Sequence, residues 1–371
     1  AAVLSMAILS MFPKHNVLEN NLVQTSASAG ESLAAGVIFT IPALVMLGFW
    51  AQFDFWTVTM ISGIGGILGV LFTIPLRRAL IVPGELQFPE GVATAAVLRT
   101  GNNGGSGSLK RIALGALGGA LFKLGQAGLN VWTSTTEIAA RVGGTVVYFG
   151  SDLSPALVSV GDIVRLNIAA LVFMGGFISW YIAIPIYFML YGDAYAGKEA
   201  AEAAWEIWNT RIRYLGVGAM VVGGLWALVS LRSALVTGIM SGIEAVRERK
   251  QQGEVDAKEL DLPMNWVLAA ICAGVVPLFA LYYSVTDSLI ISVPMSVVML
   301  IAGFLFSAVA GYMAGLVGSS NNPISGVTIA TILFASLLLV ALIGSDAGMK
   351  GAAYAIFIGA VVCCAAAIAG D

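Results

Sequence analysis

Residues 290–316 read IISVPMSVVMLIAGFLFSAVAGYMAGL, an apolar run without a charged side chain. A helix needs about 20 mostly apolar residues to cross the hydrocarbon core of a bilayer. Similar runs occur at 32–51, 56–76, 109–128, 166–190, 212–231, 264–283, 327–344 and 351–369, and residues 1–12 resemble the tail of another. The pattern predicts an all-α integral membrane protein, a polytopic bundle of about ten spans with re-entrant or broken helices.

The composition of the chain excludes an ordinary soluble domain. Hydrophobic residues make up 58% of the 371 residues and charged residues 11%, against roughly 45–50% and about 25% in soluble proteins. Mean hydropathy is +0.91. The net charge of −3 gives no reason to expect a nucleic-acid partner.

Loop charges predict how the chain threads the membrane. Lysine and arginine gather at Arg77-Arg78, at 99–111 and at 232–261, which the positive-inside rule places on the cytoplasmic side. The acidic loop 191–208 then lies outside. This path holds only if 129–150 crosses the membrane.

The path also needs 79–98 to enter and leave on the cytoplasmic side. This segment contains Pro83 and Pro89, each of which removes a backbone donor and disfavours helix in the residue before it. Broken backbone at membrane depth requires surrounding protein or water. We therefore expect 79–98 to be re-entrant.

The domain organisation follows from the same pattern. Residues 1–371 predict a single transmembrane domain, and both ends read as cut, because the chain opens within an apolar run and closes on Gly370-Asp371. Residues 232–262 predict a charged cytoplasmic connector between spans.

Three polar stretches interrupt the apolar pattern: ENNLVQTSASAGE at 19–31, ELQFPEGVAT at 85–94 and GSSNNPISGVT at 318–328. They predict the path of a solute or proton through the membrane. The candidate residues are Asn20, Asn21, Gln24 and Glu31; Glu85, Phe88, Pro89, Glu90, Gly91 and Thr94; and Ser319, Ser320, Asn321, Asn322, Pro323, Ser325 and Gly326.

The third stretch predicts a helix start inside the membrane. Pro323 suits the first turn of a helix, and Asn322 or Ser325 could cap its amides. Such a start carries a partial positive charge that favours anions, and transporters build midplane sites this way. The Asn-Asn pairs at 20–21 and 321–322 indicate either an internal repeat or a chance match.

Intramembrane carboxylates are costly and usually functional, so Glu31, Glu85 and Glu90 are candidates for carrying a proton or binding an amine. The alternative is that each lies at a helix end in the headgroup region. His15 is the only histidine, and no cysteine has metal-site spacing. We expect no metal site and no cofactor. The tryptophans fall near the ends of predicted spans, as interfacial anchors do.

At these segments the sequence resembles the oligopeptide transporter (OPT) family. The blocks GLVGSSNNPISG at 315–326 and LQFPEGVATA at 86–95 are similar to its prokaryotic members, with support from LENNLVQT at 18–25, YLGVGAM at 214–220 and DLP at 261–263. The blocks occur in the family's order over nearly the whole chain.

The resemblance implies a fragment of a secondary transporter, driven by a proton gradient, that carries small peptides or peptide-like metal chelates. It also implies a multi-pass protein of the cytoplasmic membrane of a prokaryote. The peptide-branch motifs Asn-Pro-Gly and Lys-Ile-Pro-Pro-Arg are absent from the sequence, which leaves open the cargo, including another small amphipathic solute. The oligomeric state is open too.

Two other classes fit the sequence less well. A channel would need a filter loop or a ring of like residues, and the spans here are dissimilar. An intramembrane aspartyl protease would need a Gly-x-Gly-Asp motif, which is absent, and a Ser–His hydrolase would have to use His15, the only histidine.

Overall fold

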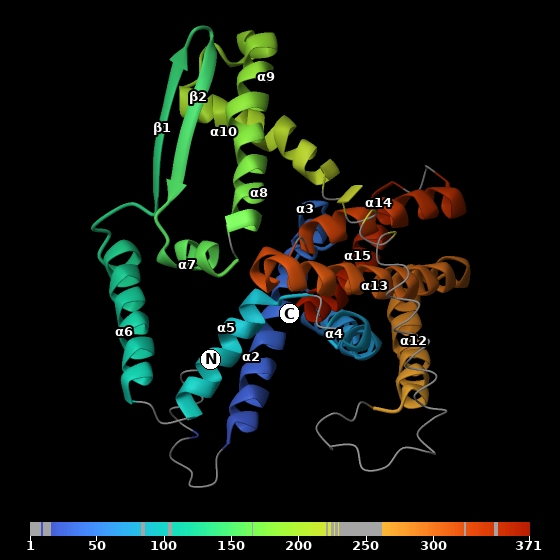
Figure 1. The fold of residues 1–371 in the computed structure, drawn as a ribbon. Coiled ribbons are helices and arrows are strands. Elements are labelled where there is room, and N and C mark those ends of the chain that lie inside the picture. Colours follow the sequence, from blue (N-terminus) through green and yellow to red (C-terminus); the bar gives the residue numbers. More distant parts are fainter. Residues whose placement is uncertain are drawn as a thin grey trace. The chain divides into compact units, whose positions relative to one another are not determined.

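The protein is mostly helical in a computed structural model (Figure 1). The structure describes residues 9, 16–82, 86–102, 106–164, 166–219, 222–223, 226, 229, 262–322, 324–344 and 348–371. The expected cut span at 1–12, the connector at 232–262 and the second half of the span at 212–231 lie almost wholly outside these residues, as do Glu85, Pro323 and the side chain of Asn321.

Contacts within the chain divide it into two compact units. The first, here called the hairpin unit, comprises Ala1–Asn21 and Pro89–Ala219. The second, here called the core unit, comprises Leu22–Phe88 and Met220–Asp371. Each unit is described by itself.

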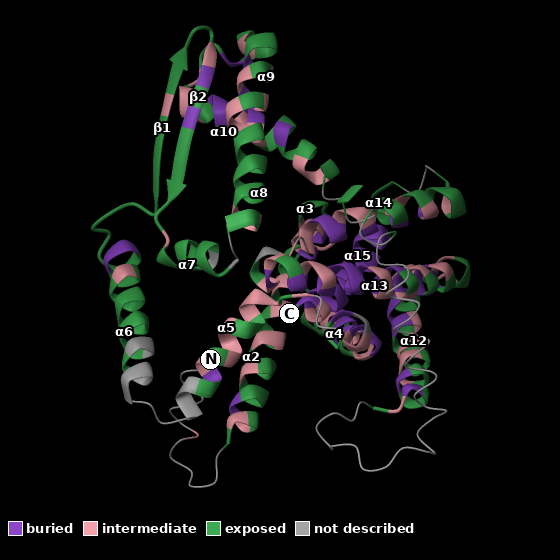
Figure 2. Ribbon diagram, viewed as in Figure 1, coloured by how far each residue is buried: buried purple, intermediate pink, exposed green. Residues whose placement is uncertain are grey.

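The core unit is a helical bundle built around its last helix. Most of α15 is buried, and it packs against α4, α13 and α14 (Figure 2). The elements of this unit, with the helix that leads into it, are α2 (Val17–Ile38), α3 (Pro42–Met46), α4 (Phe55–Leu80), α12 (Met264–Thr286), α13 (Leu289–Val317), a 3-10 turn η5 (Ser319–Asn321), α14 (Ile324–Ile343) and α15 (Gly348–Gly370).

The sequence explains why α15 is central, since alanine, glycine and cysteine fill most of its length. Helices in a bilayer associate through close backbone approach at small residues. A Cβ built on Gly65 of α4 would lie 2.8 Å from the carbonyl oxygen of Val361, and one on Gly69 would lie 2.7 Å from that of Ala365. The Gly-x-x-x-Gly pair of α4 therefore determines how closely α15 packs.

The hairpin unit contains a two-stranded antiparallel sheet in addition to its helices. Its elements are α5 (Pro89–Asn102), α6 (Ser106–Lys123), the π-helical turn η1 (Leu124–Gly128), β1 (Thr135–Val142), β2 (Thr145–Asp152), α7 (Pro155–Val164), α8 (Leu166–Phe177), the π-helical turn η2 (Ile178–Ala183), α9 (Ile184–Tyr191), a 3-10 turn η3 (Gly192–Tyr195), α10 (Ala200–Ile207) and the π-helical turn η4 (Trp208–Ile212).

The segment 129–150, whose crossing the loop-charge path required, forms a hairpin and not a spanning helix. Gly143 and Gly144 join the strands with φ of 58° and 81°, the left-handed turn that fits the twist of a tight hairpin. Threonine and valine, which favour strands, flank this pair. Arg141 donates hydrogen bonds to the carbonyl oxygens of Tyr195 (2.8 Å) and Ala196 (3.2 Å), which ties the hairpin to the loop after α9.

Seven helices in the described residues are long and apolar enough to span a membrane. They are Val17–Met46, Phe55–Arg78, Leu166–Tyr195, Met264–Thr286, Leu289–Val317, Ile324–Ile343 and Gly348–Gly370. The expected span at 109–128 forms α6 and η1 and is not among them. The chain is a multi-pass membrane protein, and the count of about ten spans stays a prediction.

The first polar stretch interrupts the apolar pattern of the sequence but does not interrupt a helix. Residues 17–38 form one continuous helix, α2, whose start is capped by the Asn16 side chain, which accepts from the backbone N–H groups of Leu18 (2.9 Å) and Glu19 (3.1 Å). The interruption lies later, at residues 39–41 before α3. By contrast, the backbone does leave the helix between α4 and α5 and between α13 and α14, where the other two polar stretches lie.

Candidate functional site

Small residues on the last turns of α13 bring two of the predicted segments together within the core unit. Ala310, Gly311, Ala314 and Gly315 are all buried. They recur at spacings of three and four residues, which places them on adjoining rows of one helix face. This row, here called the α13 platform, lets other backbone segments approach closely.

The first described residues of the second stretch, 86–88, lie on the α13 platform. The backbone N–H of Phe88 donates to the carbonyl oxygen of Gly315 at 3.0 Å. A Cβ built on Gly315 would meet the side chains of Leu86 at 2.8 Å and Phe88 at 3.1 Å. Phe88 has a φ of 42°, which non-glycine residues adopt rarely and mostly where the surroundings enforce it.

Asn322, from the third stretch, reaches the same platform. A Cβ added to Gly370 of α15 would collide with the Asn322 amide and would lie 3.2 Å from Ala310. Both amide atoms of Asn322 are buried, and neither has a hydrogen-bond partner among the described residues. Asn322 is therefore not the cap of α14, and the alternative cap, Ser325, stays a prediction. The break between the helices is as predicted, since α14 begins at Ile324, directly after Pro323.

The remaining residues of the second stretch begin the hairpin unit. Pro89 is the first residue of α5, and Glu90 lies in its first turn, where the helix dipole favours a negative charge. The Oε1 atom of Glu90 is shielded from solvent. Thr94 is half-buried and Gly91 is exposed.

The first stretch divides between the two faces of α2. Asn20 is only 1% exposed, and neither of its amide atoms has a partner in the described part of the chain. Gln24 is half-buried, whereas Asn21 and Glu31 are exposed. Neighbouring residues on a helix point in different directions, so the polar residues of this stretch do not form one continuous surface.

In the third stretch, Ser319 is half-buried and Ser320 is exposed within η5. Ser325 is half-buried and Gly326 is buried in the first turns of α14. Burial increases from the turn into the helix.

Sequence reasoning missed two buried hydroxyl groups and one aromatic cluster. Ser307 and Tyr282 in the core unit are fully enclosed, with no hydrogen-bond partner among the residues described. Both lie in apolar runs, so no local signal distinguishes them. In the hairpin unit, Tyr148, Trp180, Trp205 and Trp208 pack ring on ring, with centroids 4.6–6.0 Å apart.

The side chains of these segments can bind a ligand through hydrogen bonds. Among the described residues, no three histidine, cysteine, aspartate or glutamate side chains gather as a metal site would require. Buried amides without partners are costly unless a ligand or water satisfies them.

Comparison with known proteins identifies the family. The sequence profile of OPT oligopeptide transporter proteins matches residues 1–371. The chain belongs to the OPT family. Members of this family are transporters and not enzymes, in agreement with the expectation from the sequence.

Two curated relatives differ in how similar their sequences are to this chain. A candidate oligopeptide transporter of Haemophilus influenzae is 34% identical over 359 residues, which cover 94% of this chain and 56% of that protein. The probable metal-nicotianamine transporter YSL4 of Arabidopsis thaliana is 22% identical over 191 residues, 47% of this chain and 28% of that protein. The OPT chain thus spans about half the length of the nearer relative. No solved structure matches it significantly.

Proposed function

We propose that the full-length OPT protein is a secondary active transporter in the cytoplasmic membrane of a prokaryote. It carries small peptides or peptide-like metal chelates together with protons. The polar segments at 20–31, 85–94 and 319–326 contribute to its substrate and proton path.

The observation that carries this proposal is the state of Asn322. Its amide is buried at the break between α13 and α14 and has no hydrogen-bond partner in the described chain. An amide offers two donors and an acceptor with two lone pairs, which matches the backbone groups of a peptide. Leaving it unsatisfied costs ~1–3 kcal/mol, and a polar solute bound in the path would offset that cost.

The two relatives support two cargo classes. The bacterial relative is named for oligopeptides and the plant relative for a metal–nicotianamine complex. Identity is higher to the first, and peptide amides complement Asn322 directly. We therefore place peptides first and amino-acid-type chelates second.

A competition screen tests the cargo. The full-length protein in proteoliposomes is given radiolabelled tri-alanine, and unlabelled peptides and metal-loaded or metal-free chelators compete. Peptides should suppress uptake while free amino acids and bare metal ions do not. Suppression by chelates alone would reverse the order of the two classes, and absence of competition by either would contradict the proposal.

A further inference from the structure

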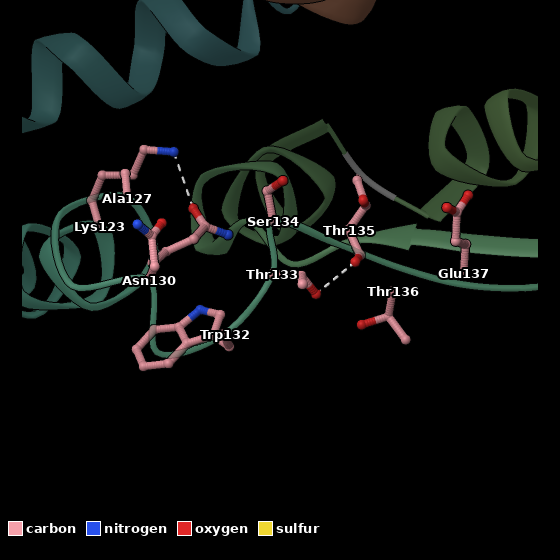
Figure 3. Close-up of a pocket in the computed structure, with 10 residues that line it drawn as sticks. Lys123, Ala127, Asn130, Trp132, Thr133, Ser134, Thr135, Thr136 and Glu137 are labelled. Carbon is pink, nitrogen blue, oxygen red and sulfur yellow. Dashed lines mark hydrogen bonds between the residues drawn. The ribbon is translucent and has the colours of Figure 1, made fainter.

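A groove of about 910 Å³ lies within the hairpin unit (Figure 3). Small-molecule sites typically have volumes of roughly 300–1,000 Å³. Lys123 and Glu137 lie at opposite ends of a row of threonine and serine side chains (Figure 3). The groove thus has a cation at one end and an anion at the other.

The groove faces the edge of a strand. Thr135, Thr136 and Glu137 are consecutive residues of β1, and all three line it. Successive side chains on a strand point to opposite faces of the sheet, so a groove that contacts all three must face the strand's edge. In the described chain β1 pairs with β2 alone, which leaves backbone donors and acceptors on the other edge. One of these acceptors, the carbonyl oxygen of Thr135, already accepts from the hydroxyl of Thr133 at 2.8 Å, and its second lone pair remains.

The positive end of the groove is positioned by a buried amide. Lys123 Nζ donates to Oε1 of Gln126 at 3.0 Å, and Gln126 Nε2 donates to the carbonyl oxygen of Leu153 at 3.2 Å. Gln126 is only 7% exposed. An ammonium group has three donors, so two remain for a ligand carboxylate.

The negative end is positioned by the aromatic cluster. Glu137 Oε2 accepts from the hydroxyl of Tyr148 at 2.8 Å and from the indole Nε1 of Trp205 at 3.4 Å. Burial, and then the bond to Glu137, raise the pKa of Tyr148 above its ordinary value, so its hydroxyl stays protonated and donates. A carboxylate offers about four lone-pair sites, which leaves room for a ligand ammonium.

We propose that this groove binds a short, extended peptide with free ends. Its backbone pairs with the open edge of β1, its ammonium group binds Glu137 and its carboxylate binds Lys123. Addition of a strand to a sheet edge supplies affinity through main-chain hydrogen bonds. The two charged ends determine the direction and length of the peptide. This site goes beyond the proposed transport path, because none of the residues that line it belongs to the segments 20–31, 85–94 or 319–326.

Site-specific protection tests this binding. The full-length protein carrying Thr136→Cys is placed in lipid nanodiscs, and N-ethylmaleimide labelling of the new thiol is followed by mass spectrometry. Tri-alanine should slow the labelling. N-acetyl-tri-alanine and tri-alanine amide should each need about ten-fold more for half protection, since each loses one hydrogen bond to a charged group. Ser159→Cys on the exposed surface of α7 is the control and should show no protection.

Charge-removing variants assign the two ends. Lys123→Met should raise the half-protecting concentration of tri-alanine about ten-fold and abolish the preference over the amide. Glu137→Gln should abolish the preference over the acetylated peptide. Lys110→Met on α6 and Glu202→Gln on α10 remove exposed charges outside the groove and should change neither value.

Two outcomes would overturn the inference. One is unprotected labelling at saturating tri-alanine, both in Thr136→Cys and in the second position Ser134→Cys, which guards against a misfolded variant. The other is a Lys123→Met protein that still prefers the free carboxylate. Protection without uptake would sustain this site and contradict the transport proposal, whereas uptake without protection would do the reverse.

Discussion

Asn322 is the residue on which the proposed path depends most. Its amide atoms are buried without partners in the described structure. Thr331 lies in α14 and is fully buried, but its hydroxyl donates to the carbonyl oxygen of Val327 at 2.9 Å. Replacing these two polar side chains with apolar ones should therefore have opposite effects on stability and on uptake.

Asn322→Leu should leave the melting temperature unchanged or raise it, because an unpaired buried amide costs ~1–3 kcal/mol and leucine has a similar volume. Uptake by the same variant should fall at least ten-fold. Thr331→Val should lower stability by about 1 kcal/mol through the lost hydrogen bond and leave uptake intact. Thermal unfolding in one detergent and proteoliposome uptake measure both. A clear loss of stability in Asn322→Leu would show that the amide has a structural role.

At the residue scale, the position of a polar residue within its stretch does not tell whether its side chain is enclosed. Asn20 is buried and the amide atoms of the half-buried Asn322 are enclosed, whereas Asn21 and Glu31 are exposed. The difference arises from helical geometry: polar residues in one block point around the helix, and only tertiary packing decides which face is enclosed. Ser307 and Tyr282 could not have been found, because only packing distinguishes them from the apolar residues around them.

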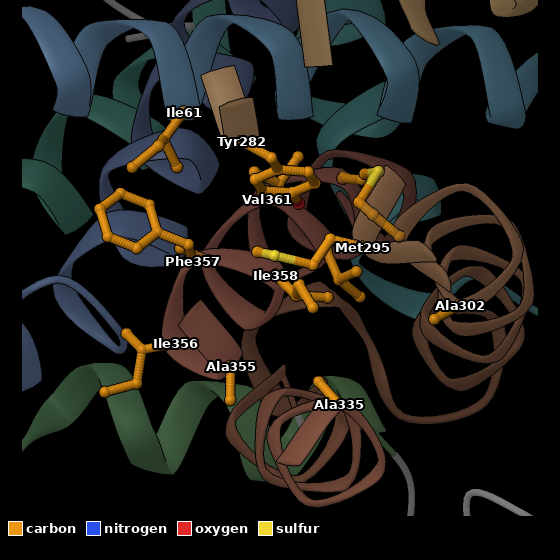
Figure 4. Packing of buried hydrophobic residues seen from close by; sticks show 14 of the residues in the cluster. Ile61, Tyr282, Met295, Ala302, Ala335, Ala355, Ile356, Phe357, Ile358 and Val361 are labelled. Carbon is orange, nitrogen blue, oxygen red and sulfur yellow. The ribbon is translucent and has the colours of Figure 1, made fainter. Parts of the chain in front are cut away.

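At the element scale, the packing of α4 on α15 is the feature most sensitive to volume. Buried side chains such as Phe357, Ile358 and Val361 of α15 fill the centre of the core cluster (Figure 4). Beside them, Gly69 admits the backbone of α15 with no space for a methyl group. Gly63, on the same helix, has nothing within 4 Å of the position of a Cβ.

Gly69→Ala should therefore destabilise the protein by about 1–3 kcal/mol, the usual cost of overpacking. Gly63→Ala should stabilise it by up to about 1 kcal/mol, since alanine favours helix over glycine. Thermal unfolding of the two variants under identical conditions gives the comparison. Equal melting temperatures would contradict the close approach of α4 and α15.

The hairpin was predictable from the sequence and was overlooked. Strand-favouring residues flank Gly143-Gly144, a hairpin signal, but the apolar content of 129–150 favoured a span. The path through the membrane that the loop charges predict required a span at this position. The hairpin supplies no spanning helix at this position. Arg141 ties it to residues 195–196, a contact between segments 54 residues apart that no local pattern reveals.

Arg141→Met should detach the end of the hairpin, because three backbone carbonyl oxygens, those of Tyr195, Ala196 and Lys198, accept from this guanidinium. Hydrogen–deuterium exchange should rise in 141–148 and 192–198 and stay unchanged in α13. Arg211→Met, an exposed arginine of η4, should leave all three regions unchanged. Unaltered exchange at the hairpin in Arg141→Met would show that strand packing alone holds it.

At the scale of the whole molecule, composition and span length predicted the class of protein. Six of the candidate spans agree in position with predicted runs, and Val17–Met46 overlaps the predicted run 32–51 in part. The agreement arises because a membrane helix needs about 20 apolar residues. Which helix is central could not be read from hydropathy alone. The α15 helix is enclosed by its neighbours, whereas α8 has no buried residue, although both are strongly apolar.

The central claim, proton-coupled transport, is tested most directly by uptake into proteoliposomes that contain the full-length protein. With tri-alanine as substrate, an imposed gradient that is acidic outside should accelerate uptake at least several-fold, and a protonophore should abolish the acceleration. Glu90→Gln, which removes the ionisable group while keeping its shape, should remove the response to the gradient without loss of protein from the membrane. Uptake that is the same with and without the pH gradient would contradict the account.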